Sequence, residues 1–159
     1  MSTEGSPKIV ERGSFTVVGV VCLEPPLMIY AWIALAARRD EIEGIEDPHM
    51  LYGVWHRTPD HEGPGSNACL VGFQVAEAVD VPDGLAAYTV PAVRFAAFKH
   101  RGHIGHIGAT YDRIGTWFRA RPEVVAQRPP GVGAIEVYDT RQPIAGDYEF
   151  TILEPVLWM

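Results

Sequence analysis

The chain has 159 residues, so its length predicts a single domain. Its 13 Lys and Arg against 20 Asp and Glu give a formal net charge of −7, which argues against nucleic acid as the natural partner because nucleic-acid binders carry a basic stripe. The N-terminus shows no apolar signal-peptide segment, and no apolar run approaches the ~20 residues of a membrane helix. We therefore expect a cytoplasmic protein that does not enter the membrane.

The first half of the chain predicts a strand, a helix and two further strands. Phe15–Cys22 is apolar and β-branched, which is typical of a buried strand. Residues 27–42 are rich in Ala and Leu and follow Pro26, which suits the first turn of a helix. Strands are expected over 51–56 and 68–78, with the polar loop TPDHEGPGSN between them.

The second half predicts the same order of elements. After a short edge strand at 85–90, we expect a strand over 94–100, a helix over 103–119, and strands over 134–139 and 148–157. The helix carries one apolar face, with spacings of four, three and four residues: Ile107, Tyr111, Ile114 and Phe118.

Short sequence matches between the halves indicate an internal duplication. FQVAEAV at 73–79 matches FTILEPV at 150–156 with an offset of 77 residues, and GVW at 53–55 aligns with EVY at 136–138 with an offset of 83. Chance resemblance between short strands is the alternative.

The expected fold is therefore a single α+β domain over 1–159, built from repeats at about 8–80 and 84–157. Each repeat is a strand–helix–strand–strand unit, and the two are related by a pseudo-twofold axis. We expect an antiparallel sheet with two helices on one face. A ligand cleft is expected on the other face, at the junction of the repeats.

The strand at 134–139 carries the most informative residue of the chain. Because side chains alternate along a strand, Ile135 and Val137 share one face, and Glu136 and Tyr138 share the other. We expect the first pair to pack on the helices and the second to face the cleft. An unpaired buried charge is costly. Glu136 is then partnered, protonated or awaiting a cation, unless this face is wet and it is an ordinary surface acid.

The alignment of the two halves makes Trp55 the counterpart of Tyr138, pointing into the same cleft. Tyr52 and His56 are expected on the opposite face unless a bulge intervenes. An acid flanked by Trp and Tyr forms a cage suited to lipophilic cations. The alternative is that both aromatics belong to the core.

The histidines do not predict a metal site. His100, His103 and His106 are spaced three residues apart but match no fixed-geometry metal motif, so exposed or capping histidines are expected. The glycines among them lack the strand–turn–helix setting of a phosphate loop, and we expect no cofactor. Cys22 and Cys69 are expected to be buried free thiols. Glu77 and Glu154 are expected to be solvated acids, and the alternatives are that they line the rim of the cleft or pair with an arginine.

Taken in chain order, several segments resemble the GyrI-like, or AraC-type effector-binding, small-molecule-binding domains. They are PKIVERGSFTVVGV, YGVWHRTPD, LVGFQVAEAV, FAAFKHRGHIGHIGATYDRIGTWF, AIEVYD and DYEFTILEPV, and they cover the chain from about residue 8 to 156. The resemblance implies a fold of two tandem strand–helix–strand–strand units. Family members often follow a helix-turn-helix domain. Because the domain starts about eight residues from Met1, we expect the stand-alone form.

The resemblance also implies a ligand and a site. In the drug-sensing relatives a glutamate on a central strand, surrounded by aromatics, receives lipophilic cations, and the E-x-Y motif places it on Glu136 with Tyr138 as its tyrosine. Trp55 and Tyr111 match positions that are aromatic in some relatives. We therefore expect a multidrug-type binding protein for aromatic, lipophilic, cationic small molecules, with these four residues as the ligand-binding set.

Three alternatives follow from the same resemblance. Some stand-alone relatives are hydrolases that open strained cyclopropane rings. In such an enzyme Glu136 would activate water, and Tyr138 or Tyr111 would position the water or donate a proton. A binding protein is favoured over this enzyme. A second alternative is a protein-interaction module that acts on an enzyme partner. The heme-binding SOUL domains share the fold, but no axial ligand is recognised, and this reading ranks third.

Overall fold

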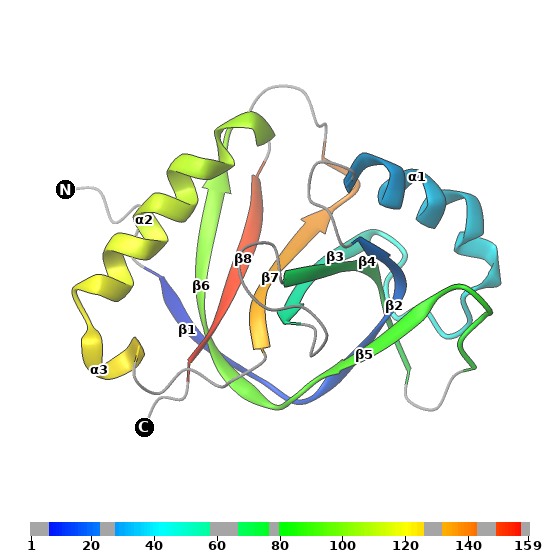
Figure 1. The fold of residues 1–159 in the computed structure, drawn as a ribbon, viewed down its shortest axis with the longest axis horizontal. Coiled ribbons are helices and arrows are strands. Elements are labelled where there is room, and N and C mark those ends of the chain that lie inside the picture. Colours follow the sequence, from blue (N-terminus) through cyan, green and yellow to red (C-terminus); the bar gives the residue numbers. More distant parts are fainter. Residues whose placement is uncertain are drawn as a thin grey trace.

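The computed structural model describes residues 7–22, 28–57, 67–76, 80–125, 132–142 and 149–156. In this part of the chain, eight antiparallel strands form one sheet with helices packed on it (Figure 1). The strands are β1 (Lys8–Arg12), β2 (Phe15–Cys22), β3 (Met50–Arg57), β4 (Asn67–Val75), β5 (Ala86–Val90), β6 (Val93–Arg101), β7 (Val132–Asp139) and β8 (Glu149–Val156). The helices are α1 (Met28–Arg38), α2 (Ile107–Arg119) and the short α3 (Pro122–Val125), with 3-10 turns at Arg39–Glu41 and Ile104–His106.

The α+β class is confirmed, and every predicted strand and helix is present. The strand Phe15–Cys22 has the predicted ends. The helix predicted over 27–42 is α1 followed by a 3-10 turn, and the one predicted over 103–119 is a 3-10 turn followed by α2. The short strand β5 lies at an edge of the sheet, as expected. The loop predicted between β3 and β4 falls on 58–66, outside the described residues.

Two elements were not predicted. β1 pairs with β6 at the other edge of the sheet, but its five residues include only two apolar side chains, Ile9 and Val10, so the pattern is too short and polar to predict a strand. The four-residue helix α3 begins at Pro122, directly after α2. None of the helices in the described residues is long and apolar enough to span a membrane.

The strand order is β1-β6-β8-β7-β3-β4-β2-β5. From the centre outwards, β7-β8-β6-β1 on one side corresponds to β3-β4-β2-β5 on the other. A helix follows the equivalent strand in each half, since α1 follows β2 and α2 follows β6. This arrangement is the one that a duplication would produce. The duplication itself and its boundaries at 8–80 and 84–157 stay predictions.

The two faces of the sheet carry different cores. A helix-free face holds one buried cluster: Phe15, Val17, Tyr52, Val54, Leu70, Val90, Phe95, Ile135 and Leu153. The opposite face holds two clusters. One lies under α1 and includes Ala31 and Leu35, and the other lies under α2 and includes Ile114 and Phe118. Both helices therefore cover one face, as predicted.

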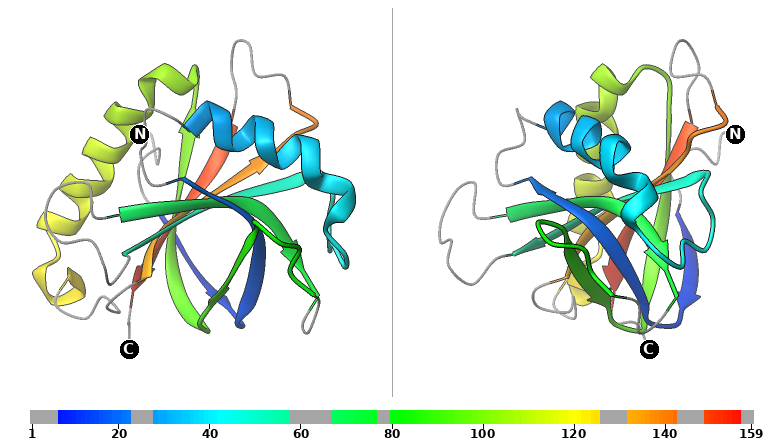
Figure 2. Two further views of the ribbon diagram at one scale, coloured as in Figure 1. Left: turned by 45° about the vertical axis from the view of Figure 1, so that its right-hand side comes forward. Right: turned by 90° about the vertical axis from the view of Figure 1, so that its right-hand side faces the viewer.

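The predicted orientation of Glu136 and Tyr138, away from the helices, is wrong, whereas the cleft itself stays a prediction. Glu136 and Tyr138 lie on the face that carries the helices, and Ile135 lies on the helix-free face. The reason is the curvature of the sheet, whose strands curl below the two helices (Figure 2). Because the helix-free face closes on its own apolar side chains, it needs no helix to bury them. Glu136 and Tyr138 lie on the other face, beside the helices.

Two glycines permit a close approach of strands within this curled sheet. Gly19 of β2 and Gly72 of β4 lie directly opposite each other. A Cβ on Gly19 would collide with the backbone of Val71, and a Cβ on Gly72 would collide with the backbone of Val18. Glycine at a tight bend of a sheet is common for this reason, and neither position accepts a side chain without moving a strand.

Candidate functional site

Glu136 lies at the centre of the sheet and is almost completely buried. On β7 it pairs with Ile152 of β8 on one side and with Gly53 of β3 on the other. Only 8% of its surface is exposed. A carboxylate in such a place needs hydrogen-bond donors, because an unsatisfied buried charge costs several kcal/mol.

Three elements supply these donors. The hydroxyl of Tyr138, on the same strand, donates to Oε1 of Glu136 at 2.5 Å, and the hydroxyl of Tyr111, on α2, donates to Oε2 at 2.5 Å. The indole N–H of Trp55, on β3, donates to Oε2 at 3.4 Å. The structure thus brings together all four residues that the sequence and the family resemblance singled out. Their role in ligand binding stays a prediction.

The two phenols are strong, permanently protonated donors. Burial raises the pKa of Tyr111 and of Tyr138 far above the ordinary value, and the negative charge of Glu136 raises both further. Both hydroxyls therefore stay neutral throughout the physiological pH range. Hydrogen bonds of 2.5 Å to a carboxylate are among the strongest that proteins form.

The partners of Glu136 satisfy its oxygens without neutralising its charge. All the hydrogen-bond donors that the described residues supply to it are neutral groups, and the ion pairs among those residues lie elsewhere. This is the electrostatic feature that distinguishes Glu136 from the surface acids of the chain.

Further aromatic rings surround the carboxylate cluster. Tyr138 stacks on Phe150 of β8, with ring centroids 4.4 Å apart. Trp32 of α1 contacts Tyr138 edge to face at 5.8 Å. The sequence analysis did not single out Trp32 or Phe150. Two signals were available: Trp32 directly follows a core position of its helix, and Phe150 shares the strand phase of Ile152, the partner of Glu136.

Gly53 leaves space directly beside the carboxylate. A Cβ at this position would lie 3.7 Å from Oε1 of Glu136 and 3.6 Å from Sγ of Cys69, which are ordinary contact distances. A methyl group therefore fits, and a longer side chain would extend over the acid. The sequence analysis aligned Gly53 with Glu136 but did not recognise it as a site residue.

The thiol of Cys69 lies beside the site without being a nucleophile. Burial raises the pKa of Cys69 well above its ordinary value, and the charge of Glu136 raises it further. Both Cys69 and Cys22 are buried thiols that form no disulfide, as predicted, and they are paired in the register of β2 and β4.

Two predictions about polar residues are wrong. Glu154, expected to be solvated, is only 7% exposed, and its charge contributes to the raised pKa of Tyr111. His100, expected at the surface or in a cap, is 1% exposed. Both lie on strands next to α2, so the packing of that helix buries them.

Other expectations have mixed outcomes. His103 and His106 are exposed, as predicted, and Nδ1 of His103 accepts a hydrogen bond from the backbone N–H of Gly105. Tyr52 lies on the face of the sheet opposite to Trp55, as predicted. The side chains of His56 and Glu77 lie outside the described residues. The described ranges contain no group of three or more His, Cys, Asp or Glu side chains that is suited to a metal ion.

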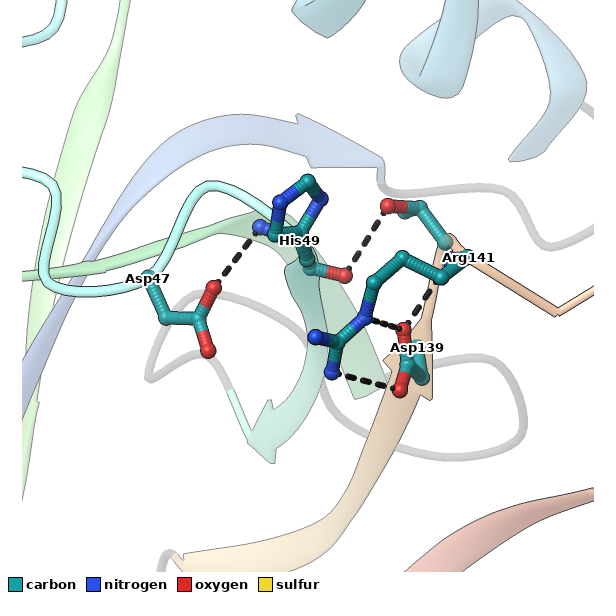
Figure 3. Close-up of polar contacts among 5 residues, drawn as sticks. Asp47, His49, Asp139 and Arg141 are labelled. Atoms are coloured by element: carbon teal, nitrogen blue, oxygen red, sulfur yellow. Dashed lines mark hydrogen bonds and ion pairs between the residues drawn. The ribbon is translucent and has the colours of Figure 1, made fainter.

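An exposed turn that follows Tyr138 and Asp139 in the chain holds the end of β7 close to the start of β3 (Figure 3). The backbone N–H and the hydroxyl of Thr140 both donate to the carbonyl of His49, at 2.8 and 3.0 Å. Arg141 forms two side-chain hydrogen bonds with Asp139, which lower the pKa of that carboxyl to about 2. These contacts fasten the strand end that carries the site tyrosine.

Comparison with known proteins places this geometry in a family. The chain matches the model of the GyrI-like small molecule binding domain over residues 6–154. It is 34% identical over 110 residues to the transcriptional regulator BrlR of Pseudomonas aeruginosa. That match takes in 67% of this chain and 39% of the regulator, so the chain spans about two-fifths of the length of this curated relative.

Solved structures share the fold at low sequence identity. SAV2435, whose structure holds tetraphenylphosphonium, superposes with a TM-score of 0.71 and 12% identity, covering 94% of this chain and 93% of that one. The C-terminal domain of EcmrR has a TM-score of 0.67 and 10% identity, covering 94% of this chain and 95% of that one. At these identities the likeness concerns the fold alone.

The fold and the match along nearly the whole chain define a small-molecule-binding domain of the α+β class. The chain belongs to the GyrI-like small-molecule-binding domain family, and the membership expected from the sequence is confirmed.

Proposed function

We propose that this domain binds aromatic, lipophilic cations, with Glu136 as the counter-charge. The observation that carries the proposal is a carboxylate that is 8% exposed and hydrogen-bonded to neutral donors. Its charge is stabilised but not cancelled, so a cation placed beside it gains a Coulomb energy that the low local dielectric strengthens. The cytoplasmic setting expected from the sequence belongs to this proposal.

The aromatic side chains supply the second part of the recognition. Trp55, Tyr111, Tyr138 and Trp32 lie around the carboxylate or in contact with its partners. Aromatic faces attract cations and also stack on aromatic ligands. Because stacking has weaker directional demands than hydrogen bonding, such a site accepts a range of ligands. The similarity in fold to a protein that holds tetraphenylphosphonium supports this cation as the first probe.

The test is the substitution Glu136→Gln, which keeps the size of the side chain and removes its charge. We expect the dissociation constant for tetraphenylphosphonium to rise about tenfold or more, which corresponds to ~1.4 kcal/mol or more. Binding of triphenylphosphine oxide, a neutral relative that keeps three of the four phenyl rings, should change much less. Isothermal titration calorimetry on the two ligands measures both constants.

Glu149→Gln is the matched control. It removes one carboxylate charge from the exposed ion pairs with Lys99 and Arg101, outside the site, and should leave both ligands unaffected. Equal weakening of the charged and the neutral ligand in folded Glu136→Gln would contradict the counter-charge role.

A second candidate function is hydrolysis of a strained electrophile. The contact that favours it is the pairing of one carboxylate with two protonated phenols at 2.5 Å, since a base and a proton donor would then be side by side. Incubation with a cyclopropane-containing alkylating agent separates the two functions. Repeated turnover to a water adduct, detected by mass spectrometry and lost in Glu136→Gln, supports the enzyme. Retention of one equivalent of unchanged ligand supports the binding protein.

A further inference from the structure

A buried histidine lies behind the carboxylate cluster without touching Glu136. His100, near the end of β6, is 1% exposed. Its Nε2 lies 3.1 Å from the backbone carbonyl of His103, and its Nδ1 lies 2.7 Å from the hydroxyl of Thr110. A carbonyl only accepts, so Nε2 carries a proton, and in the tautomer with its proton there Nδ1 accepts from the hydroxyl of Thr110. Arg113 donates to the same hydroxyl at 3.3 Å, which agrees with this direction.

The first link from His100 runs to Tyr111. Thr110 and Tyr111 are consecutive residues of α2, and Thr110 is buried. In an α-helix, consecutive side chains are about 100° apart around the axis. A hydrogen bond that fixes Thr110 against β6 therefore also fixes the direction in which Tyr111 leaves the helix. That direction leads to Oε2 of Glu136.

The second link runs to Tyr138. His100 pairs with Phe150 in the register of β6 and β8, and the two rings pack with centroids 5.0 Å apart. Phe150 in turn stacks on Tyr138 at 4.4 Å. The imidazole of His100 thus packs against Phe150, and the ring of Tyr138 stacks on Phe150.

We propose that His100 is a positioning residue for the carboxylate cluster, holding Tyr111 through Thr110 and Tyr138 through Phe150. Its consequence for ligand affinity rests on the proposed function, whereas its effect on the two phenols does not. The two links use different parts of the ring, since one needs the Nδ1 acceptor and the other needs the aromatic surface. They can therefore be broken separately.

The first experiment uses the protein without ligand. Hydroxyl protons in short hydrogen bonds to a carboxylate resonate far downfield in proton NMR, and Tyr111→Phe and Tyr138→Phe assign the two signals. His100→Phe keeps a ring and removes the acceptor, so we expect the Tyr111 signal to shift or disappear and the Tyr138 signal to stay. His100→Asn offers Oδ1 as the acceptor and removes the ring. We therefore expect the Tyr138 signal to shift or disappear and the Tyr111 signal to stay.

Substitutions of the neighbouring threonine provide matched controls that leave the histidine in place. Thr110→Val removes the hydroxyl at nearly constant volume and should reproduce the loss of the Tyr111 signal. Thr110→Ser keeps the hydroxyl and should retain it. If His100→Phe and Thr110→Val leave the Tyr111 signal unchanged, or if every variant alters both signals equally, the histidine is only a core residue and the proposal is wrong.

The second experiment measures tetraphenylphosphonium binding in the same variants. We expect His100→Phe and Thr110→Val to weaken binding about three- to tenfold, and Thr110→Ser to leave it unchanged. In a Tyr111→Phe background, His100→Phe should have little further effect, because its acceptor acts through Tyr111. If His100→Phe weakens binding equally in the wild-type and the Tyr111→Phe proteins, the histidine does not act through Tyr111. If the wild-type protein does not bind this cation, the proposed function fails, and the NMR result still decides the role of His100.

Discussion

At the scale of single residues, the charge of Glu136 is tolerated because three neutral donors converge on it. Two of them, the hydroxyls of Tyr111 and Tyr138, approach to 2.5 Å. A basic partner in place of these donors would have formed an internal ion pair and left no net charge for a ligand. On the proposed function, these neutral donors leave the charge of Glu136 available to a cationic ligand.

Gly53 provides the next prediction at this scale, since its missing side chain leaves room beside Oε1 of Glu136. Gly53→Ala should bind tetraphenylphosphonium nearly as the wild type does, because a methyl group sits at ordinary contact distances. Gly53→Leu should weaken tetraphenylphosphonium about tenfold or more and should affect the smaller phenyltrimethylammonium much less. Calorimetric titration of both cations measures the difference.

The small cation also controls for folding, because a variant that still binds it has kept the site. Retention of full tetraphenylphosphonium affinity in Gly53→Leu would show that the space beside Gly53 is not used by the ligand.

At the scale of elements, the site depends on strands from the middle of the sheet and on one helix. β7 carries both Glu136 and Tyr138, its neighbour β3 carries Trp55, and α2 carries Tyr111. Central strands are hydrogen-bonded on both sides, so they hold the acid rigidly. α2 is joined to the sheet through polar as well as apolar contacts.

The close approach of β2 and β4 at Gly19 and Gly72 gives a prediction for these strands. A Cβ at Gly72 would collide with the backbone carbonyl of Val18. Gly72→Ala should therefore lower the free energy of unfolding by about 1–3 kcal/mol, as expected for overpacking. Urea denaturation measures this change.

Gly108→Ala is the control for that experiment. Gly108 is an exposed position of α2 with no atom near its potential Cβ, and alanine favours a helix by roughly 0.5–1 kcal/mol over glycine. A Gly72→Ala protein as stable as the Gly108→Ala protein would contradict the role given to the close approach.

At the scale of the whole molecule, most of the net charge of −7 serves a different purpose from Glu136. Surface charges are screened within about 8 Å at physiological salt, so they steer cations weakly and select none. On the proposed function, selection requires a charge that is shielded from water, and Glu136 is 8% exposed. The remaining acids mainly favour solubility.

The stability of the whole domain should be limited at alkaline pH. Burial raises the pKa of Tyr111 and Tyr138 above 10.0, and that of Cys69 above 9.0. A raised pKa in the folded state contributes stability that is present below the ordinary pKa and is lost as pH rises above it. We expect the urea midpoint to fall between about pH 8 and about pH 11.

Variants without these groups identify the cause of the alkaline loss. Tyr138→Phe should lose less stability than the wild type over the same interval, because one of the titrating groups is gone. If both proteins lose the same amount, general repulsion between the negative charges explains the loss instead.

Much of the element order was accessible from the sequence, because it depends on local patterns. The continuous apolar, β-branched run Phe15–Cys22 predicted a strand with the correct ends. The apolar stripe of α2, which includes Ile114 and Phe118, predicted its buried face. β1 was not accessible in this way, because it is an edge strand with two apolar residues and its pairing with β6 supplies its stability.

By itself, the sequence determined that Glu136 and Tyr138 share a face, since residues two apart on a strand always do. The alignment of the two halves added Trp55, and resemblance to a family added Tyr111. The tertiary structure decided which face is the site, because alternation separates two faces without saying which one a curled sheet will close. It also brought Phe150, Gly53 and His100 to the cluster, since contacts between strands and helices distant in the chain leave no local pattern.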